Sequence, residues 1–304
     1  REVTRNITVS ADAPNIVYNL VDPNSINSNG WAKNNFYVKA TITDNSGTGI
    51  KTAKSCSTTS GSSCVPTASI EGLTKDFYIS VEGNNRLCIE VTDNNNKTTM
   101  LCSDVYKLDK TAPVAGTANI TGTAWSNGWY TSNVTISAVN GTDALSGHDS
   151  TKTSVSSITT NTTGQVVTIT TTDLAGNTAT RNYTIKIDKN TPTTPVITGG
   201  STAWSSTAKT ISVSTASTSP SGINYYQYYI STSATSQTGG SWINLGSGVT
   251  TASISTNGTR YIYFRAVNTA GKVSGISAAQ TTKIDTTQPA LKAKATTNTM
   301  AKGT

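Results

Sequence analysis

The sequence predicts an all-β protein made of three consecutive two-layer β-sandwich domains, and three observations predict this fold. Serine and threonine supply 95 of the 304 residues, whereas the strong helix formers Leu, Glu, Gln and Met are scarce, so strands and turns are favoured over helices. A short motif recurs at intervals of one small domain. Between its copies, apolar residues alternate with polar residues, as in strands that bury one face.

The recurring motif ends in proline and is expected to mark the domain boundaries. It occupies 108–113 (LDKTAP), 187–192 (IDKNTP) and 284–289 (IDTTQP), with a weaker copy at 11–14 (ADAP). Its aspartates, Asp12, Asp109, Asp188 and Asp285, are 97, 79 and 97 residues apart, which is the size of a seven-stranded sandwich and too long for a solenoid repeat. We therefore expect the tail of a preceding repeat at 1–14, domains at 15–112, 113–191 and 192–288, and a tail or the start of another module at 289–304.

A hairpin turn is predicted towards the end of each domain, at 92–97 (TDNNNK), 172–177 (TDLAGN) and 267–272 (VNTAGK). Gly176 and Gly271 supply the positive φ that such a turn requires, and Asn96 is the next-best residue at this place. The strand that enters each turn carries its apolar residues on one parity, which predicts half-buried antiparallel strands. These residues are Leu87, Ile89 and Val91; Val167, Ile169 and Thr171; Ile262, Phe264 and Ala266.

Tryptophans are predicted to pack in the core near the start of each domain. Trp31, the pair Trp125 and Trp129, and Trp204 precede alternating runs such as 134–138 (VTISA). One tryptophan per domain at a matching place is more typical of core packing than of a ligand platform. The segments 44–47, 143–147 and 219–223 are predicted to be turns that join the next strands.

These motifs, in this order, resemble the tandem bacterial immunoglobulin-like repeats of secreted and cell-surface proteins. The resemblance covers 15–288 and rests on the tryptophan-led strand, a D-x-x-S-G turn, a D-x-A-G-N turn and the closing I-D-K-T-x-P motif. The first domain departs from the pattern, because its Asn-rich turn lacks the glycine. The resemblance implies tandem immunoglobulin-like sandwiches in an elongated array outside the cell. Adhesins, stalks and accessory regions of extracellular enzymes all use such repeats, so the fold alone does not select a function.

All four cysteines fall in the first domain, and they allow three disulfide connectivities. Cys88 and Cys102 are equidistant from Asn95, the middle of the predicted hairpin turn. In a simple antiparallel register they would therefore face each other across two strands. Cys56 and Cys64 would then close a polar loop. Metal binding would need C-x-x-C spacing or histidines, so disulfides and an oxidising compartment are favoured.

The predicted register contains one conflict near the second cysteine. Tyr106 and Leu108 have the pattern of core residues and share the parity of Cys102, whereas Cys88 lies on the outward parity of its own strand. A bulge between Leu101 and Tyr106 would reconcile the two patterns.

No motif in the sequence predicts catalysis. The single histidine, His148, lies in a polar loop, and 206–209 (STAK) lacks the partner motifs of a penicillin-recognising nucleophile. Phosphate-binding glycine loops are absent. The net charge of +7 comes from basic residues scattered singly, which argues against nucleic-acid binding. No apolar run has the length of a membrane span. We therefore expect neither an enzyme nor membrane insertion in this segment.

Calcium is the one cofactor for which the sequence offers candidates. Asp109 and Asp188 lie at the domain boundaries, and Asp143 and Asp173 lie in predicted turns. Calcium takes six to eight oxygen ligands, and these aspartates are isolated in the sequence. Aspartates that stabilise turns are the alternative interpretation.

The third domain holds a run of aromatic residues that could bind a ligand: Tyr225, Tyr226, Tyr228 and Tyr229, with Trp242 downstream. Alternation puts Tyr225 and Tyr229 on one side of a strand and Tyr226 and Tyr228 on the other, so at least two rings are expected on the outer face. Exposed aromatic residues can bind glycans or partner proteins. A cross-strand tyrosine ladder that only stabilises the sheet is the alternative.

The sequence thus favours a non-catalytic stalk, spacer or adhesion segment of a bacterial cell-surface or secreted protein, which presents a distal functional domain. Its linkers are short and contain proline, so we expect semi-rigid connections. Its expected partners are the neighbouring domains of a longer chain. One alternative is direct binding of a glycan or host protein through the third domain, and another is an accessory region of a secreted carbohydrate-active enzyme.

Overall fold

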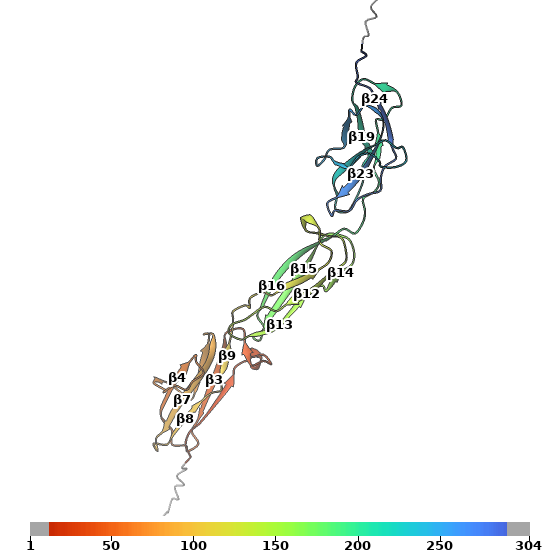
Figure 1. The fold of residues 1–304 in the computed structure, drawn as a ribbon. Helices are drawn as coiled ribbons and strands as arrows, with labels where there is room; N and C mark the ends of the chain where they lie inside the picture. The colour runs from red at the N-terminus through yellow and green to blue at the C-terminus, as the bar shows by residue number, and fades with distance from the viewer. Residues whose placement is uncertain (1–11, 291–304) are drawn as a thin grey trace, which may run out of the picture. The chain divides into compact units, whose positions relative to one another are not determined.

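The computed structural model describes residues 12–290, which form strands and turns (Figure 1). Within this range the only helical segments are the two short 3-10 helices η1 (Pro23–Ser25) and η2 (Ser126–Gly128). Most of the predicted tails at 1–14 and 289–304 lies outside the described residues. The chain divides into two compact units. One contains the residues up to Ile120 with Ile136–Ser156 and Val166–Tyr183, and the other contains Thr121–Thr135, Ser157–Gln165 and the residues from Thr184 onward.

The first pair of sheets is built from β1 to β9. One sheet has the strand order β1-β3-β6, with β1 at Asn15–Leu20, β3 at Phe36–Thr43 and β6 at Thr74–Ile79. The other has the order β2-β9-β7-β4-β5, and β8 also pairs with β7. Its strands are β2 (Trp31–Ala32), β4 (Ile50–Thr58), β5 (Ala68–Ser69), β7 (Gly83–Asp93), β8 (Thr98–Cys102) and β9 (Tyr106–Leu108).

The second and third pairs of sheets repeat this arrangement. In the second the orders are β10-β12-β14 and β11-β16-β15-β13, and in the third they are β17-β19-β22 and β18-β24-β23-β20-β21. The strands of the second pair are β10 (Thr117–Thr121), β11 (Trp129–Tyr130), β12 (Val134–Val139), β13 (His148–Thr153), β14 (Ser157–Ile158), β15 (Thr162–Asp173) and β16 (Thr178–Ile187). Those of the third are β17 (Val196–Thr198), β18 (Trp204–Ser205), β19 (Lys209–Thr215), β20 (Ile223–Ser231), β21 (Ile243–Asn244), β22 (Thr251–Ile254), β23 (Gly258–Asn268) and β24 (Gln280–Ile284).

The shared strand order is that of immunoglobulin-like sandwiches. In the first and third sandwiches the first, second and fifth main strands form one sheet and the third, sixth and seventh form the other. The second sandwich has the same order without the strand that corresponds to β5 and β21. A short strand that begins with tryptophan pairs in parallel with the last strand: β2 with β9, β11 with β16 and β18 with β24. The prediction of all-β, immunoglobulin-like sandwiches is therefore confirmed.

The buried residues lie where the alternating pattern places them. On β7, β15 and β23 the nine predicted core positions are at most 1% exposed. In the third sandwich, Ile211 and Ile254 from one sheet and Phe264 and Ile284 from the other belong to a single core cluster, so the two sheets bury their apolar faces against each other.

The hairpin turns that follow these strands have the predicted conformation. Gly176 and Gly271 have φ of 92° and 80°, and Asn96 has φ of 60°. We call the residues 94–96, 174–176 and 269–271 the tip turns of the three domains.

Candidate functional site

The recurring aspartates are buried where one domain continues into the next. Asp109 and Asp188 are both fully buried. The Asp109 N–H donates to Ala32 O and the Asp188 N–H to Tyr130 O, each at 2.9 Å. These hydrogen bonds fix each aspartate beside the short tryptophan strand of its own domain. Each carboxylate then faces the turns of the following domain, and we call these two places the first and second junctions.

At the first junction the second domain supplies hydrogen bonds to the linker. The Asp109 carboxylate accepts from the N–H of Thr111 at 2.9 Å and from the N–H of Ser146 at 3.0 Å. The Asn177 side-chain amide donates to Asp109 O at 2.9 Å. The linker aspartate is thus bonded to two different turns of the second domain.

Three of the four calcium candidates come together at this junction. One carboxylate oxygen from each of Asp109, Asp143 and Asp173 lies within 4.8 Å of the others, and Asp109 and Asp173 are buried. Burial alone would raise the pKa of Asp143. The N–H groups of Gly147 and Leu145 and the Ser146 hydroxyl outweigh this effect and hold the pKa below its usual range.

A calcium ion in this cluster would require six to eight oxygen ligands. The carboxylate oxygens are of the right chemical type, but N–H groups already point at most of them. Asn177 donates to both oxygens of Asp173, and three donors converge on one oxygen of Asp143. These residues do not form a calcium shell, and we assign no step to a cation here.

The second junction has the same layout with neutral partners. Asp188 Oδ2 accepts from Ser219 Oγ at 2.6 Å, from Ser221 N at 3.0 Å and from Asn268 Nδ2 at 3.0 Å. Ser219 and Asn268 occupy the positions that Asp143 and Asp173 occupy at the first junction. The second junction therefore pairs one carboxylate with three donors of the third domain, whereas the first brings three carboxylates together.

Hydrogen bonding also sets the ionisation of Asp188. Burial alone would raise its pKa, but the hydrogen bonds from Ser219 and Ser221 outweigh burial and lower the pKa below its ordinary value of 3.8. A carboxyl whose pKa is lowered by folding stabilises the fold above its unfolded pKa. That contribution is lost as the pH falls through the folded pKa.

The contrast between the junctions gives a prediction for Asp173→Asn. The asparagine can repeat the interactions of Asn268, because its Oδ1 still accepts the N–H of Asn177, its amide can donate to the Asp109 carboxylate, and one like charge is removed. Asn177 Nδ2 loses one acceptor but keeps Asp109 O. We expect the free energy of unfolding to rise by about 1 kcal/mol, measured by calorimetry with calcium chloride or with EDTA. The reciprocal variant Asn268→Asp is expected to lose stability. If a cation held the three carboxylates together, Asp173→Asn would be destabilising and calcium would raise the melting temperature of the parent chain.

The fourth calcium candidate, Asp188, does not join any acidic cluster among residues 12–290. Its partners are hydroxyl, amide and N–H donors, which suit a hydrogen-bonded carboxylate and not a cation site.

The four tryptophans that were predicted to pack in the core divide into a buried pair and an exposed pair. Trp31 and Trp129 are 8% and 7% exposed, and Lys107 Nζ and Lys186 Nζ lie over their rings at 5.4 and 5.9 Å from the centroids. The packing prediction is confirmed for these two residues. It is wrong for Trp125 and Trp204, which are 53% and 61% exposed.

Each tip turn of the second and third domains contacts the domain before it. At the first junction, the side-chain amides of Asn27 and Asn29 donate to Leu174 O at 2.8 and 3.2 Å. At the second, the Trp125 ring lies so close to Gly271 that a Cβ on this residue would overlap it. Nothing in the sequence pairs a loop of one domain with a turn of the next, so these contacts could not be predicted.

The tyrosines of the third domain do not form one exposed aromatic platform for a ligand. Tyr226 is buried in the core cluster and Tyr228 packs against it, as the alternation predicts. On the outer face, Tyr229 is buried because its hydroxyl hydrogen-bonds to Gly240 and its ring packs against Trp242 at 5.4 Å between centroids. Tyr225, Tyr228 and Trp242 are partly exposed. Of the two tyrosine rings expected on the outer face, Tyr225 is partly exposed and Tyr229 is covered.

The Arg265 side chain covers part of this face. Its guanidinium lies 4.2 Å from the Trp242 ring centroid and donates to Gln227 Oε1. This arrangement is a cross-strand cluster that stabilises the sheet.

An exposed aromatic pair lies instead in the first domain. Tyr37 and Tyr78 are directly opposite on β3 and β6, with ring centroids 4.8 Å apart. Both are about half exposed, and Asn35 donates to the Tyr78 hydroxyl. The outward parity of the two strands was the signal in the sequence that could have revealed this pair.

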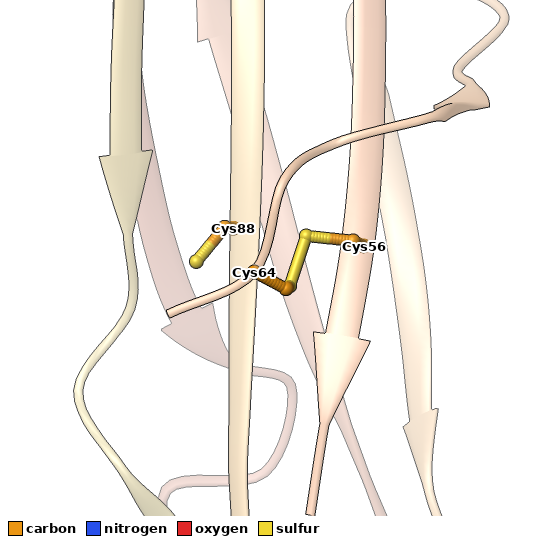
Figure 2. Close-up of side chains that lie close together, drawn as sticks. All are labelled: Cys56, Cys64 and Cys88. Atoms are coloured by element: carbon orange, nitrogen blue, oxygen red, sulfur yellow. A yellow bond between two sulfur atoms is a disulfide. The ribbon is translucent and has the colours of Figure 1, made fainter. Parts of the chain in front are cut away.

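The structure contains two disulfides, Cys88–Cys102 and Cys56–Cys64, which is the connectivity that the spacing favoured. Cys88 is opposite Cys102 on β8 and opposite Cys56 on β4. Figure 2 shows the Cys56–Cys64 bond with the Cys88 sulfur beside it. The sulfurs of Cys56, Cys64 and Cys88 lie within 4.8 Å of one another. Since all four cysteines are bonded, no thiolate is available as a metal ligand.

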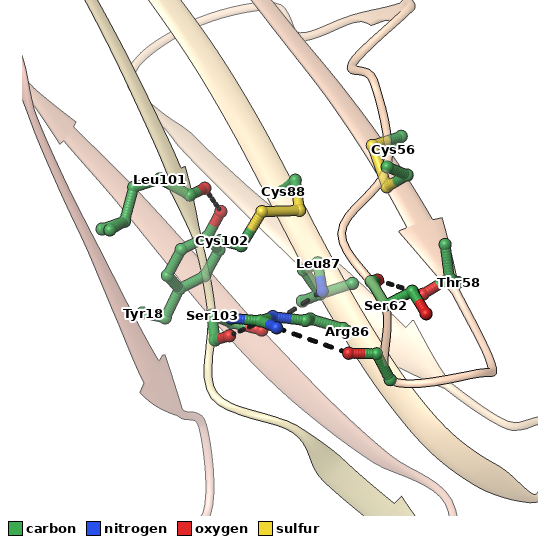
Figure 3. Close-up of a disulfide and its surroundings, with 12 residues drawn as sticks. Tyr18, Cys56, Thr58, Ser62, Arg86, Leu87, Cys88, Leu101, Cys102 and Ser103 are labelled. Carbon is green, nitrogen blue, oxygen red and sulfur yellow. Dashed lines mark hydrogen bonds between the residues drawn. A yellow bond between two sulfur atoms is a disulfide. The ribbon is translucent and has the colours of Figure 1, made fainter.

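The predicted bulge is an interruption of the last strand between β8 and β9. Ser103 leaves the strand, and its hydroxyl accepts the N–H of Leu87 at 3.1 Å while its own N–H donates to Leu87 O. Arg86 spans the interruption by donating to Ser103 O and, on its other side, to Gly61 O in the loop closed by Cys56–Cys64 (Figure 3). The interruption changes the parity, so that Tyr106 and Leu108 reach the core.

Comparisons with known proteins find the chain similar only to solved structures. No protein-family model and no curated protein matches the sequence. A structure of domains from titin is 15% identical and covers 89% of this chain and 99% of that one, with a TM-score of 0.31. A bacterial ice-binding adhesin is 12% identical, with coverages of 90% and 99% and a TM-score of 0.31. A Ca²⁺-stabilised adhesin of an Antarctic bacterium is 12% identical, with coverages of 91% and 75% and a TM-score of 0.33.

Residues 12–290 contain no helix long and apolar enough to cross a membrane. The fold assignment follows from the strand order of the sheets and not from these distant likenesses. The chain consists of immunoglobulin-like β-sandwiches joined through short linkers whose aspartates are buried.

Proposed function

We propose that this chain is a non-catalytic spacer, a stalk or adhesion segment of a cell-surface or secreted bacterial protein that holds a distal functional domain in place. The observation that carries this proposal is the bonding of each linker to the domain that follows it. Asp109 and Asp188 are buried and accept hydrogen bonds from the turns of the next domain. Such bonds restrict the angle between neighbouring domains, which is what a spacer requires.

The disulfides support a location outside the cytoplasm. Structural disulfides persist in oxidising compartments and are rare where glutathione keeps thiols reduced. The first domain is also small, and small extracellular domains commonly depend on such crosslinks. The burial of Tyr229 covers part of the aromatic face on which ligand binding through the third domain would rest, whereas Tyr225 and Trp242 stay partly exposed there.

The proposal is tested by measuring distances between domains in the full chain. Spin labels on p-acetylphenylalanine at the exposed positions Thr180 and Ser253 leave the disulfides intact. We expect a narrow distance distribution, and we expect Asp188→Ala to widen it about two-fold. The same variant removes the acceptor of Ser219 Oγ, Ser221 N and Asn190 N, whereas Asn268 Nδ2 keeps Asn190 O and Ser219 Oγ as acceptors. It should cost about 2 kcal/mol of stability.

Asp285→Ala is the matched control. Asp285 accepts the N–H of Thr287 in its own turn, as Asp188 accepts that of Asn190, but no domain follows it in the described residues. The control should leave the distribution unchanged. A broad distribution in the parent chain would contradict the spacer function.

A further inference from the structure

Three tryptophans occupy one equivalent position, and only one of them is exposed. Trp31, Trp129 and Trp204 each begin the short strand that pairs in parallel with the last strand, opposite Lys107, Lys186 and Lys283. Trp31 and Trp129 are 8% and 7% exposed, whereas Trp204 is 61% exposed. The difference does not come from the strand pairing, because that pairing is the same in all three domains.

The difference follows the presence of a next domain. Ala175 and Ala270, in the tip turns of the second and third domains, are 3% and 0% exposed. The equivalent Asn95 of the first domain is exposed, and no domain precedes it in the described residues. Trp31 lines one groove with Ala175 and Gly176. A tip turn of small residues therefore lies against the tryptophan end of the domain before it.

Asp285 differs from its counterparts in the same way. Its N–H donates to Ser205 O at 2.9 Å, which repeats the bonds of Asp109 to Ala32 and of Asp188 to Tyr130. Its carboxylate is exposed and, within residues 12–290, accepts only from Thr287 in its own turn. The carboxylates of Asp109 and Asp188 both accept from the following domain.

We infer that the end of the third domain, at Trp204 and Asp285, is a docking surface for a following immunoglobulin-like domain. The tip turn of that domain would carry a small Ala-Gly pair over Trp204, and a Ser-Gly turn would donate N–H or hydroxyl groups to Asp285. Continuity with the two existing junctions selects this occupant. At those junctions the equivalent aspartates make the same backbone hydrogen bonds beside the equivalent tryptophans. A second copy of this chain is a poorer fit, since its free tip turn, 94–96, consists of three asparagines.

The experiment extends the chain by one domain. A copy of residues 193–304 is fused after Pro289, which keeps the Asp-to-Pro linker spacing of the second junction. The copy carries Trp204→Phe, so that the measured tryptophan is the original Trp204. Hydroxyl-radical footprinting with mass spectrometry then measures the oxidation rate of the original Trp204 against that of Trp31. In the chain without extension Trp204 should react fast. In the extended chain its rate should fall about five-fold, towards that of a buried tryptophan.

Two controls make the result decisive. Ala270→Trp in the appended copy alone should restore the fast oxidation of Trp204, because the bulky tip turn cannot close over it. If trypsin digests the first copy, which would show that it is not folded, a second extension with residues 114–191 takes its place. This extension offers the Ala175-Gly176 tip turn to the same surface. A trypsin-resistant extension that leaves Trp204 fast overturns the inference. Concentration-dependent protection in the unextended chain also overturns it, because a second copy would then be the occupant.

This inference rests on the proposed spacer function, but a negative result in one test is distinguishable from a negative result in the other. The distance measurement between Thr180 and Ser253 concerns the second junction, whereas the footprinting concerns only the end of the third domain.

Discussion

Replacing both Cys88 and Cys102 by alanine is expected to lower the free energy of unfolding of the first domain by about 3 kcal/mol. The bond closes a loop with a sequence separation of 14 and joins β7 to β8. Strand β8 ends where the chain leaves the sheet at Ser103, and among residues 12–290 it pairs only with β7. Apart from this pairing, the disulfide and the hydrogen bonds to Tyr18 and Pro14 hold β8 in place. Hydrogen exchange followed by mass spectrometry, read on the peptides of β7, measures the stability of this domain within the full chain.

The matched control is the double variant Cys56→Ala with Cys64→Ala. This disulfide closes a shorter loop with a sequence separation of 8, and both residues are partly exposed. We expect a loss of about 2 kcal/mol, confined to the loop and β4. An equal or larger loss than in the Cys88–Cys102 variant would contradict the structural role assigned to β8.

Gly271→Ala is expected to destabilise the second junction by about 2–3 kcal/mol. Two costs add at this position. The residue has φ of 80°, which strains any side chain by about 1 kcal/mol, and the new methyl group would overlap the Trp125 ring. Calorimetry on the full chain gives the stability, and the oxidation rate of Trp125 shows whether its ring has been displaced.

Gly176→Ala separates the two costs. Gly176 has φ of 92°, but the nearest atom to a Cβ there is Lys33 Cδ at 3.9 Å, so only the backbone strain applies and about 1 kcal/mol should be lost. In a Trp125→Ala background, Gly271→Ala should also cost only about 1 kcal/mol. Equal effects of Gly271→Ala with and without Trp125 would show that the ring does not pack on this glycine.

The folds of the individual domains could be predicted because they depend on local patterns. Alternation along β7, β15 and β23 identified the core residues, and the positive φ required at Gly176 and Gly271 located the turns. Cysteine spacing favoured the pairing found in the structure because Cys88 and Cys102 are symmetric about a turn. The parity conflict at Tyr106 also pointed to the interruption of the last strand.

The junctions could not be predicted because their contacts join segments far apart in the sequence. Asp109, Asp143 and Asp173 are isolated along the chain, yet two turns of the second domain bring them within 4.8 Å. The exposure of Trp204 could not be predicted either, because its strand has the same pattern as those of Trp31 and Trp129. Burial of Tyr229 depends on the segment that contains Gly240 and Trp242, and nothing in the alternation of β20 indicates that cover.

Nitrogen-15 relaxation of the backbone amides across residues 12–290 tests the central claim most directly. If the buried linker aspartates hold successive domains together, amides on β7, β15 and β23 should report one common rotational diffusion tensor. Separate and faster tumbling of each domain, at the rate of a free unit of its size, would contradict the account.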